Sequence, residues 1–317
     1  MRQKAVLGID LGGTKISGAI FNHSSNIVQS EQMLINGMEG NEVATLLVRL
    51  IERLQVAAER MSLSINAVGI AIPGIFNALE GTVWAPNIKG WEKFPLPAQL
   101  RKRFGDAFHI EIDNDRSCYI LGETWMGAAK GSKNAIFLAV GTGIGAGIMV
   151  DGQVLRGQSG IAGAVGWLAL SDKFIEPYGQ YGCFEHHASG HGMARIAAKA
   201  YRKAGKAESF EKLTAEDVFE FYSKGDPVAI NVIEEAIRYW GRTTANLVSL
   251  FNPEKIIFGG GVFGPATGFL GEIYQEALKW AQPVSITQVQ LVSSALEGRA
   301  GLYGAGWLVK DHLTTEA

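Results

Sequence analysis

The residues best suited to chemistry lie in a short turn near the start of the chain, DLGGTK at residues 10–15. Two glycines expose backbone N–H groups with no Cβ in the way, and such concave turns bind anions, especially phosphate. Thr14 and Lys15 add a hydroxyl and a positive charge to this cradle. Asp10 would repel a phosphate unless a divalent cation lay between them. The turn therefore predicts a site for Mg²⁺ bound together with a phosphate group.

Two later stretches repeat this design of an apolar strand that ends in a glycine-rich turn. They are AIFLAVGTGIGAGIMV at 135–150 and KIIFGGGVFG at 255–264. One glycine pair alone is compatible with a simple hairpin turn, but three such turns favour a binding function. A Rossmann dinucleotide site is disfavoured because GIDLGG lacks the spaced G-x-G-x-x-G and precedes a strand, and the Walker A pattern is missing from the sequence.

A second carboxylate follows the strand-like segment HIEID at 109–113. Asn114 and Asp115 come at its carboxyl end, which is the usual place for ligand groups in α/β proteins. A carboxylate suffices to orient a hydroxyl and to accept its proton during phosphoryl transfer. The alternative reading of this pair is an Asx turn that ends the strand.

The elements that must position these groups have clear patterns. Short strands are predicted at 6–9 and 16–21, and an amphipathic helix is predicted at 41–60 from its apolar positions. A strand at 67–72 ends at Pro73-Gly74, and a later helix begins with Asp226 as N-cap and Pro227 at its first position.

The composition excludes several classes of protein. With 317 residues and 47% hydrophobic content, the chain is long enough for two lobes, and its net charge of −2 gives no basic stripe for nucleic acid. Cys118 and Cys183 form no CxxC, so neither a disulfide scaffold nor a four-thiolate metal cluster is indicated. The sequence shows no signal peptide and no uncharged apolar run of ~20 residues, so we expect a cytoplasmic protein that binds a small molecule and no membrane.

The motifs together resemble a known family. Seven of them occur in the expected order: GIDLGGTK at 8–15, IPG at 72–74, APNIKGW at 85–91, DND at 113–115, AVGTGIGAGI at 139–148, GCFE at 182–185 and GGG at 259–261. Over nearly its whole length the chain is similar to sugar kinases of the repressor, open reading frame, kinase (ROK) family.

This resemblance implies an α/β actin-like ATPase (ribonuclease H-like) fold, in which ATP and sugar meet between two lobes with mixed β-sheets flanked by helices. The lobes are predicted at residues 1–117 and 118–317. The last helix is a candidate for packing against the N-terminal lobe. Relatives commonly dimerise, so a homodimer is expected.

The resemblance also implies roles for individual residues. Asp115 would be the general base that accepts the proton of the attacking sugar hydroxyl, at C6. The implied sugar-binding residues are Gly74, Asn87, Asn114, Asp115 and Glu185. The implied nucleotide-binding residues are Asp10 (through Mg²⁺), Gly12, Gly13, Thr14, Lys15, Thr142, Gly143, Gly259, Gly260 and Gly261. Trp91 is expected in the core rather than as a sugar platform.

The family's zinc motif is altered in this chain. Relatives commonly carry G-E-x-G-H, followed by C-x-C-G-x-x-G-C with three zinc thiolates, but here Ala164 and Trp167 replace the Glu and the His. Glu176 and Tyr178 stand where two thiolates belong, and only Cys183 remains. A structural zinc needs four N or S ligands, so we predict no zinc site.

Three histidines follow the altered motif. His187 and His191 are four residues apart in HHASGH, which predicts one face of a helix that also carries His186. Two histidines at this spacing can bind a metal ion, but no third ligand is evident. We therefore expect histidines that pack or lie at the surface.

The substrate stays open at this point. Ala164 and Trp167 stand where the family reads the hydroxyls around C1 and C2, which leaves glucose, an N-acetylhexosamine and fructose as candidates. An ATP-dependent hexose kinase is the leading function. A sugar-sensing transcriptional regulator of the family is not expected, because the chain begins at the first strand with no helix-turn-helix before it. The other alternative is a sugar-binding regulatory protein that has lost turnover.

Overall fold

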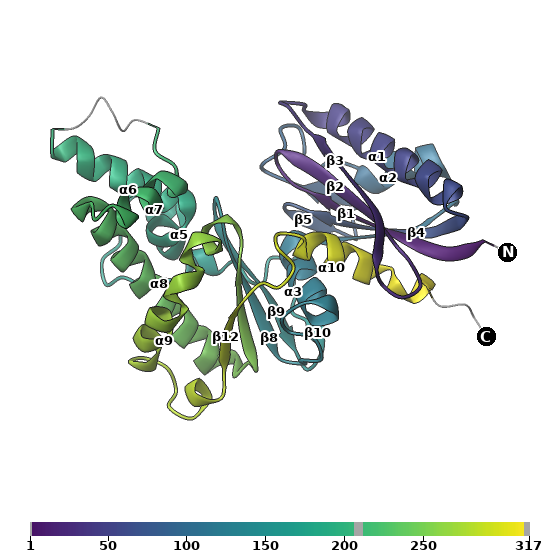
Figure 1. The fold of residues 1–317 in the computed structure, drawn as a ribbon. Helices are drawn as coiled ribbons and strands as arrows, with labels where there is room; N and C mark the ends of the chain where they lie inside the picture. Colours follow the sequence, from purple (N-terminus) through teal and green to yellow (C-terminus); the bar gives the residue numbers. More distant parts are fainter. Residues whose placement is uncertain (1, 206–211, 314–317) are drawn as a thin grey trace. The chain divides into compact units, whose positions relative to one another are not determined.

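The protein forms two compact units in this computed structural model, which describes residues 2–205 and 212–313 (Figure 1). The first unit comprises Met1–Lys130, Arg156–Ala162 and Arg299–Ala317, and the second comprises Gly131–Leu155 and Gly163–Gly298. The predicted division after residue 117 falls within a helix that runs to Met126, whereas the compact units divide after residue 130.

The first unit is built on a five-stranded mixed sheet with strand order β3-β2-β1-β4-β7. β1 is antiparallel to β2 and parallel to β4, which is parallel to β7. Its elements are β1 Gln3–Leu11, β2 Lys15–Phe21, β3 Ile27–Leu34, α1 Gly40–Arg60, β4 Leu63–Ile72, β5 Ile75–Asn77, β6 Thr82–Trp84, α2 Leu96–Phe104, β7 His109–Asn114, α3 Asp115–Met126, α10 Ala300–Leu308 and the 3₁₀ turn Lys310–Leu313.

β1 is apolar on both sides because helices cover both faces of the sheet (Figure 1). Leu7 and Ile9 share a core with Leu47 of α1, whereas Val6 shares a separate core with Leu302 of α10. Side chains alternate between faces along a strand, so this double burial produces a continuous apolar run. The predicted strands around the first glycine turn and the helix at 41–60 are confirmed.

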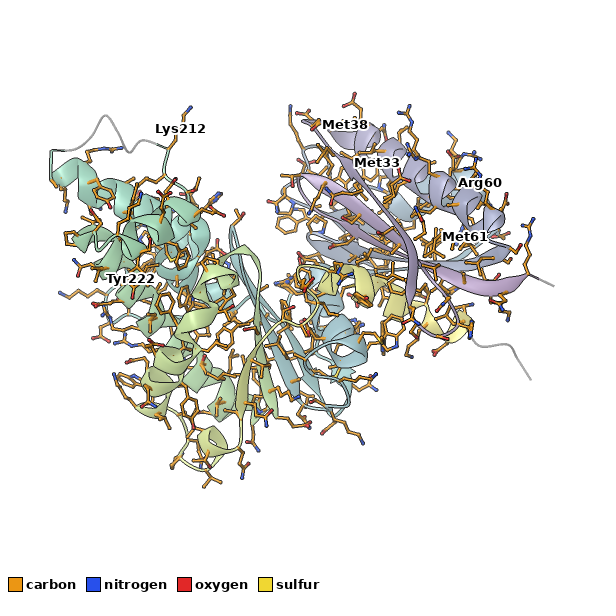
Figure 2. All side chains as sticks on the ribbon, viewed as in Figure 1. Met33, Met38, Arg60, Met61, Lys212 and Tyr222 are labelled. Atoms are coloured by element: carbon orange, nitrogen blue, oxygen red, sulfur yellow. The ribbon has the colours of Figure 1, made fainter. Side chains whose placement is uncertain are left out.

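Trp91 lies in the core on the α1 side. Its side chain is fully buried, its ring stacks on Phe94 at 4.5 Å, and its indole N–H donates to the carbonyl of Gly40 at 2.9 Å. Met33 and Met38, labelled in Figure 2, pack partly buried against the same core. Trp91 is therefore a core residue, as expected.

The helix α10 lies unusually close to the sheet and to α3. A Cβ on Gly69 would overlap the carbonyl oxygen of Ala305, and one on Gly304 would overlap that of Cys118. Since glycine alone permits such close backbone approach, these positions fix α10 against β4 and α3. The contact matters for the site because α3 begins at Asp115.

The second unit repeats the plan with strand order β10-β9-β8-β11-β12. β8 is antiparallel to β9 and parallel to β11, which is parallel to β12. Its strands are β8 Ala135–Val140, β9 Ile144–Val150, β10 Gln153–Val154, β11 Lys255–Gly259 and β12 Gln290–Ser293. Its helices are α4 Tyr178–Tyr181, α5 Cys183–Ala188, α6 Gly190–Lys203, α7 Ala215–Ser223, α8 Pro227–Phe251 and α9 Leu270–Leu278, with 3₁₀ turns at Val165–Trp167, Gly261–Phe263, Pro265–Phe269 and Ser285–Thr287. The predicted α/β class with mixed sheets flanked by helices is confirmed.

The long helix α8 begins where its sequence predicts. The side chain of Asp226 accepts the N–H of Val228 at 2.9 Å, and Pro227 takes the first helical position, where its missing N–H is not needed. Further along, the indole of Trp240 donates to the carbonyl of Ala188 at 3.1 Å, which ties α8 to α5.

Among the residues that the structure describes, no helix combines the length and the apolar character needed to span a membrane.

Replacing Gly69 by Ala tests the close packing of α10. The added methyl group would push α10 off the sheet, and we expect this overpacking to lower the free energy of unfolding by about 3 kcal/mol, measured by urea denaturation. The matched control is Gly271→Ala in α9, where a Cβ would meet nothing within 4 Å. Equal stabilities of the two variants would contradict the packing described for α10.

Candidate active site

The first glycine turn is a tight loop between β1 and β2. The N–H of Gly12 donates to the carbonyl of Lys15 at 2.9 Å, and the carbonyl of Thr14 accepts the N–H of Ile35 at 2.8 Å. The side chains of Thr14 and Lys15 are exposed, so both are accessible to a ligand. A Cβ on Gly13 would lie 3.3 Å from the Cβ of Asn87, so the turn lies against a residue predicted to bind sugar.

Asp10 lies just before this turn, on the face of β1 that α10 covers. A Cβ on Gly301, near the start of α10, would lie 2.7 Å from its Oδ2 atom. Burial raises the pKa of Asp10 to about 7; the negative charge of Asp115 adds to the rise and Lys15 opposes it. The ionised carboxylate is thus unfavourable beside a second carboxylate. Hard oxygen ligands of this kind suit Mg²⁺, whose charge would reverse that repulsion, so the residues present fit the predicted ion.

Asn114 joins β7 to α3 and has a structural role as the N-cap of the helix. Its Oδ1 accepts the N–H of Ser117 at 2.8 Å, and its Nδ2 donates to Asp113 at 3.1 Å. A structural role as an Asx cap and a role in ligand binding are therefore compatible at Asn114. Its amide has more donor and acceptor positions than these hydrogen bonds use. The cap also fixes the direction of the Asn114 side chain.

Asp113 connects Asn114 to an arginine that the sequence analysis did not single out. The Nη2 and Nε atoms of Arg156 lie 2.6 and 3.1 Å from its Oδ2, while its Oδ1 accepts from Asn114. Arg156 belongs to the first unit, although the strands before and after its segment, β10 and β11, both belong to the second unit. Nothing in the local sequence marks this pairing, because the two residues are 43 positions apart.

Asp115 is the first residue of α3, directly after the cap. Its Oδ1 accepts the N–H of Arg116 at 2.8 Å, and the hydroxyl of Tyr119, one turn later, lies 3.4 Å from its Oδ2. Burial raises the pKa of Asp115, although the positive charge of Arg116 and these hydrogen bonds oppose the rise. A carboxylate with a raised pKa is a better proton acceptor than an ordinary one.

Gly74 also has a structural reason to be glycine. A Cβ there would overlap the carbonyl oxygen of Trp84, so the chain passes very close to β6 after β4 ends. This contact joins the IPG motif to the segment that leads into Asn87.

In the second unit the turn at 141–143 closes between β8 and β9. The N–H of Gly141 donates to the carbonyl of Gly143 at 3.0 Å, and the side chain of Thr142 is exposed. The first residue of α6, Gly190, donates its N–H to the carbonyl of Gly141 at 2.8 Å. The sequence analysis missed Gly190, which brings the start of a capped helix to the predicted nucleotide turn.

The third glycine turn meets the second one. Gly260 has a φ of 90°, and a Cβ on it would overlap the carbonyl oxygen of Val140 at the end of β8. A Cβ on Gly190 would lie 3.4 Å from Val262. The turn at 141–143, the start of α6 and Gly259–Gly261 therefore gather at one edge of the second sheet, as expected for strands that are parallel neighbours.

Glu185 lies at the same edge. Its Oε2 accepts the N–H of Ile144 at 2.7 Å, and a Cβ on Gly143 would come within 2.8 Å of that oxygen. Burial raises the pKa of Glu185, while this backbone hydrogen bond and the charges of Arg195 and His191 oppose the rise. The carboxylate is thus fixed against the turn at 141–143, a contact that the sequence did not predict.

The segment with the altered zinc motif does not fit a metal ion. In the described part of the chain, no group of three or more His, Cys, Asp and Glu side chains is arranged to hold one. Cys183 is buried, and Trp167 is 57% exposed. The prediction that His187 and His191 share a helical face was wrong, because Ser189 ends α5 and its hydroxyl caps α6 by accepting the N–H of Gly192.

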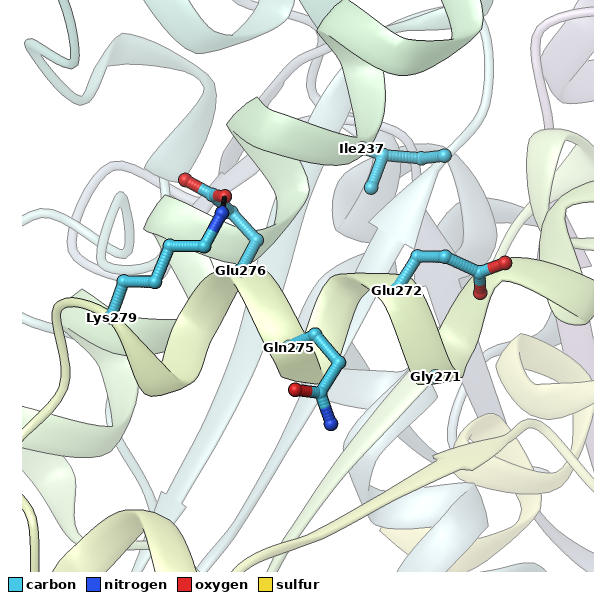
Figure 3. A pocket seen from close by; sticks show the side chains of 6 residues that line it. All are labelled: Ile237, Gly271, Glu272, Gln275, Glu276 and Lys279. Carbon is cyan, nitrogen blue, oxygen red and sulfur yellow. Dashed lines mark hydrogen bonds and ion pairs between the residues drawn. The ribbon is translucent and has the colours of Figure 1, made fainter.

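A shallow hollow of about 470 Å³ lies between α8 and α9 (Figure 3). It is lined by Ile237, Gly271, Glu272, Gln275, Glu276 and Lys279, and the Glu276 carboxylate accepts from Lys279 at 2.6 Å. None of these residues is among those predicted to bind nucleotide or sugar. The hollow is therefore not part of the candidate site.

Known proteins similar to this chain include enzymes and repressors. The model of the ROK family matches residues 6–312. A glucokinase of Halalkalibacterium halodurans is 32% identical over 321 residues, which cover 98% of this chain and 96% of the relative. A xylose repressor of Caldicellulosiruptor bescii is 30% identical over 283 residues, which cover 87% of this chain and 69% of the repressor.

Solved structures agree with this likeness. The crystal structure of a ROK family glucokinase from Streptomyces griseus in complex with glucose and AMPPNP matches with a TM-score of 0.76 and 28% identity, over 96% of this chain and 98% of that one. Together with the repeated strand order, it confirms the predicted actin-like ATPase fold. The chain belongs to the ROK family.

Proposed function

We propose that the protein is an ATP-dependent sugar kinase that phosphorylates a hexose hydroxyl, at C6. The observation that carries this proposal is the pairing of Asp10 and Asp115 within the first unit. One carboxylate precedes an anion-binding glycine turn, and the other follows a capping asparagine at the end of a strand. Phosphoryl transfer needs these two functions, a metal-linked phosphate cradle and a proton acceptor. The likeness to glucokinases supports the same chemistry.

Asp115 is the general base in this proposal. The sugar hydroxyl gives its proton to the Asp115 carboxylate as the bond to phosphorus forms, and a base with a raised pKa is suited to that step. Asn114, Asn87 and the backbone at Gly74 bind the sugar, and Glu185 contributes a further hydroxyl contact. The bonds from Arg156 through Asp113 fix the side chain of Asn114, so they support its role.

The glycine turns bind ATP in this proposal. Gly12, Gly13, Thr14 and Lys15 surround the outer phosphates, with Thr142 and Gly143 as the second phosphate turn and Gly259, Gly260 and Gly261 beside the adenosine. Asp10 holds Mg²⁺ through the nucleotide, and the bound ion would neutralise charge on the transferring phosphate. Gly190 belongs to this set, since its N–H supports the turn at 141–143.

The substrate is glucose or an N-acetylhexosamine, with fructose as the third candidate. The exposed ring of Trp167 offers an aromatic face where relatives have a histidine, and Ala164 offers no charged acceptor. An aromatic face can stack on a sugar ring or contact an acyl group. This pair of residues is therefore the first place to look for the basis of selectivity.

A catalytically impaired sugar-binding protein is the second candidate. The observations that favour it are Ala164 and Trp167 in the altered motif and the likeness to a xylose repressor. The Asp115 carboxylate and the complete glycine turns count against it, since binding alone requires no proton acceptor.

The test of the proposed function is ADP release with Mg-ATP against glucose, mannose, fructose, N-acetylglucosamine and N-acetylmannosamine, with Asp115→Asn as the blank. We expect one sugar to give a clear rate above that blank. Binding of ATP with no turnover on any sugar would overturn the kinase and favour the second candidate.

Asp115→Asn should leave sugar and nucleotide affinities within about twofold and lower kcat by roughly 10²–10⁴-fold, because the change removes the proton acceptor and little volume. Steady-state rates and separate calorimetric titrations measure the two effects. A variant with nearly normal turnover would rule out Asp115 as the base.

Asp10→Asn should change the pH dependence of stability in a defined direction. The folded-state pKa of about 7 lies above the ordinary 3.8, so wild-type stability falls as pH rises between these values and is level above them. The Asp10→Asn variant has no ionisable group at this position, so it does not lose stability in this way. Its melting temperature relative to wild type, without nucleotide, should rise from pH 4 to pH 7 and then stay constant.

The matched control for this series is Asp172→Asn, an exposed aspartate in a loop of the second unit, which should show no such trend. The same Asp10→Asn protein should lose affinity for Mg-ATP in calorimetry. A melting temperature difference that is flat across the pH range would contradict the buried state of Asp10.

A further inference from the structure

His187 links three separate segments of the second unit. Its Nε2 lies 2.6 Å from the hydroxyl of Tyr178 in α4, and its Nδ1 lies 2.7 Å from the carboxylate of Glu235 in α8. The second contact has the length of an ion pair but lies off the ring N–H direction. The imidazole also stacks on Tyr239 of α8, with centroids 4.3 Å apart and planes at 8°.

The charges in this cluster are mutually compatible. The contact with His187 lowers the pKa of Glu235, so Glu235 is a carboxylate at neutral pH. Burial raises the pKa of Tyr178, so its hydroxyl keeps its proton as a donor. The neighbouring His186 is neutral, because burial lowers its pKa to about 4, and its Nδ1 accepts from Arg195 at 3.0 Å.

The cluster occupies the segment where the family's zinc ligands are replaced. Tyr178 stands at a thiolate position, and the residues present do not fit a zinc ion. A metal at such a site ties a loop to its surroundings. The hydrogen bond between Tyr178 and His187 and the close contact between His187 and Glu235 connect α4, α5 and α8 in a comparable way without a metal.

These contacts hold a helix that carries Glu185, a residue predicted to bind the sugar. α5 has six residues, Cys183–Ala188, and contains both His187 and Glu185. A helix this short has little stability of its own, so its position depends on tertiary contacts. On the other side of α5, the carboxylate of Glu185 accepts the N–H of Ile144. Gly166 also lies close to Glu185, since a Cβ on Gly166 would be 3.1 Å from the Cβ of Glu185.

We propose that Tyr178, His187 and Glu235 are positioning residues that hold α5, and with it the carboxylate of Glu185, in the place of a zinc site. The effect on sugar binding rests on the proposed function, in which Glu185 contacts a sugar hydroxyl. The cluster contacts neither the substrate nor the turn at 141–143 directly, so its variants should change sugar binding through the position of Glu185.

Tyr178→Phe and Glu235→Gln test this positioning role, and both keep the shape of the side chain. We expect each to raise the Kd and KM for the sugar by about tenfold, because Tyr178→Phe removes the hydrogen bond to His187 and Glu235→Gln removes the negative charge beside its ring. The control is Tyr274→Phe, which removes a hydroxyl bond to Ile286 at 3.3 Å in the same unit, away from α5. It should leave the Kd and KM for the sugar unchanged.

A lower melting temperature of the Tyr178 and Glu235 variants with an unchanged sugar Kd would overturn the proposal, because the cluster would then serve stability alone. Sugar Kd values come from calorimetry and need no turnover. A wild-type protein that binds sugar without phosphorylating it would therefore defeat the proposed kinase and leave this test intact.

The metal content of the protein gives an independent readout. After expression with added zinc, elemental analysis should find far less than one zinc per chain, and a chelator should not change the melting temperature. One zinc per chain, with a melting temperature that falls on its removal, would overturn the proposal even if no sugar substrate had been found.

Discussion

The close approach of α10 to the first sheet is the constraint on which the candidate site depends. α10 contacts α3 through Gly304 and Gly122, where a Cβ would overlap backbone carbonyls of the facing helix. It contacts β1 next to Asp10, where a Cβ on Gly301 would crowd the carboxylate. Asp115 begins α3, so one helix sets the positions of both carboxylates. A wider spacing would admit water to Asp10 and would remove the cause of its raised pKa.

The two units use the same sheet order for different tasks. In the first unit the turn after β1 comes with Asp10, Asn87, Asn114 and Asp115, which supply charge and hydrogen-bonding side chains. In the second unit the turns contribute mainly backbone, and the start of α6 is held to them through Gly190. In the proposed function, the general base therefore belongs to the first unit, whereas the second unit contacts the nucleotide mainly through backbone groups.

The sequence predicted the features that depend on local pattern. The strands on both sides of the first two glycine turns, the strand before the third, the amphipathic helix α1 and the cap at Asp226 all follow from residues within a few positions of one another. The place of Asn114 and Asp115 at the end of a strand follows in the same way. The third turn leads into a 3₁₀ turn at Gly261–Phe263 and not into a second strand. A helical run through HHASGH was also predicted locally and was wrong. Ser189 offers its hydroxyl as a cap, and this tertiary setting divides the run into two helices.

Features that join distant segments could not be predicted. The pairing of Arg156 with Asp113 and the chain from Tyr178 through His187 to Glu235 each bring together residues from different elements. A single sequence contains no signal for such pairs. The exchange of two thiolates for Glu176 and Tyr178 did show that the zinc motif had changed, but only the structure shows which contacts are present instead.

The most direct test of the central claim is the position of the transferred phosphate. The protein would be incubated with Mg-ATP and each candidate hexose labelled with ¹³C, and the product examined by ³¹P and ¹³C NMR. We predict a phosphate monoester on C6 of one sugar, formed together with ADP. Release of inorganic phosphate alone, or no change in either spectrum while both ligands bind, would contradict it.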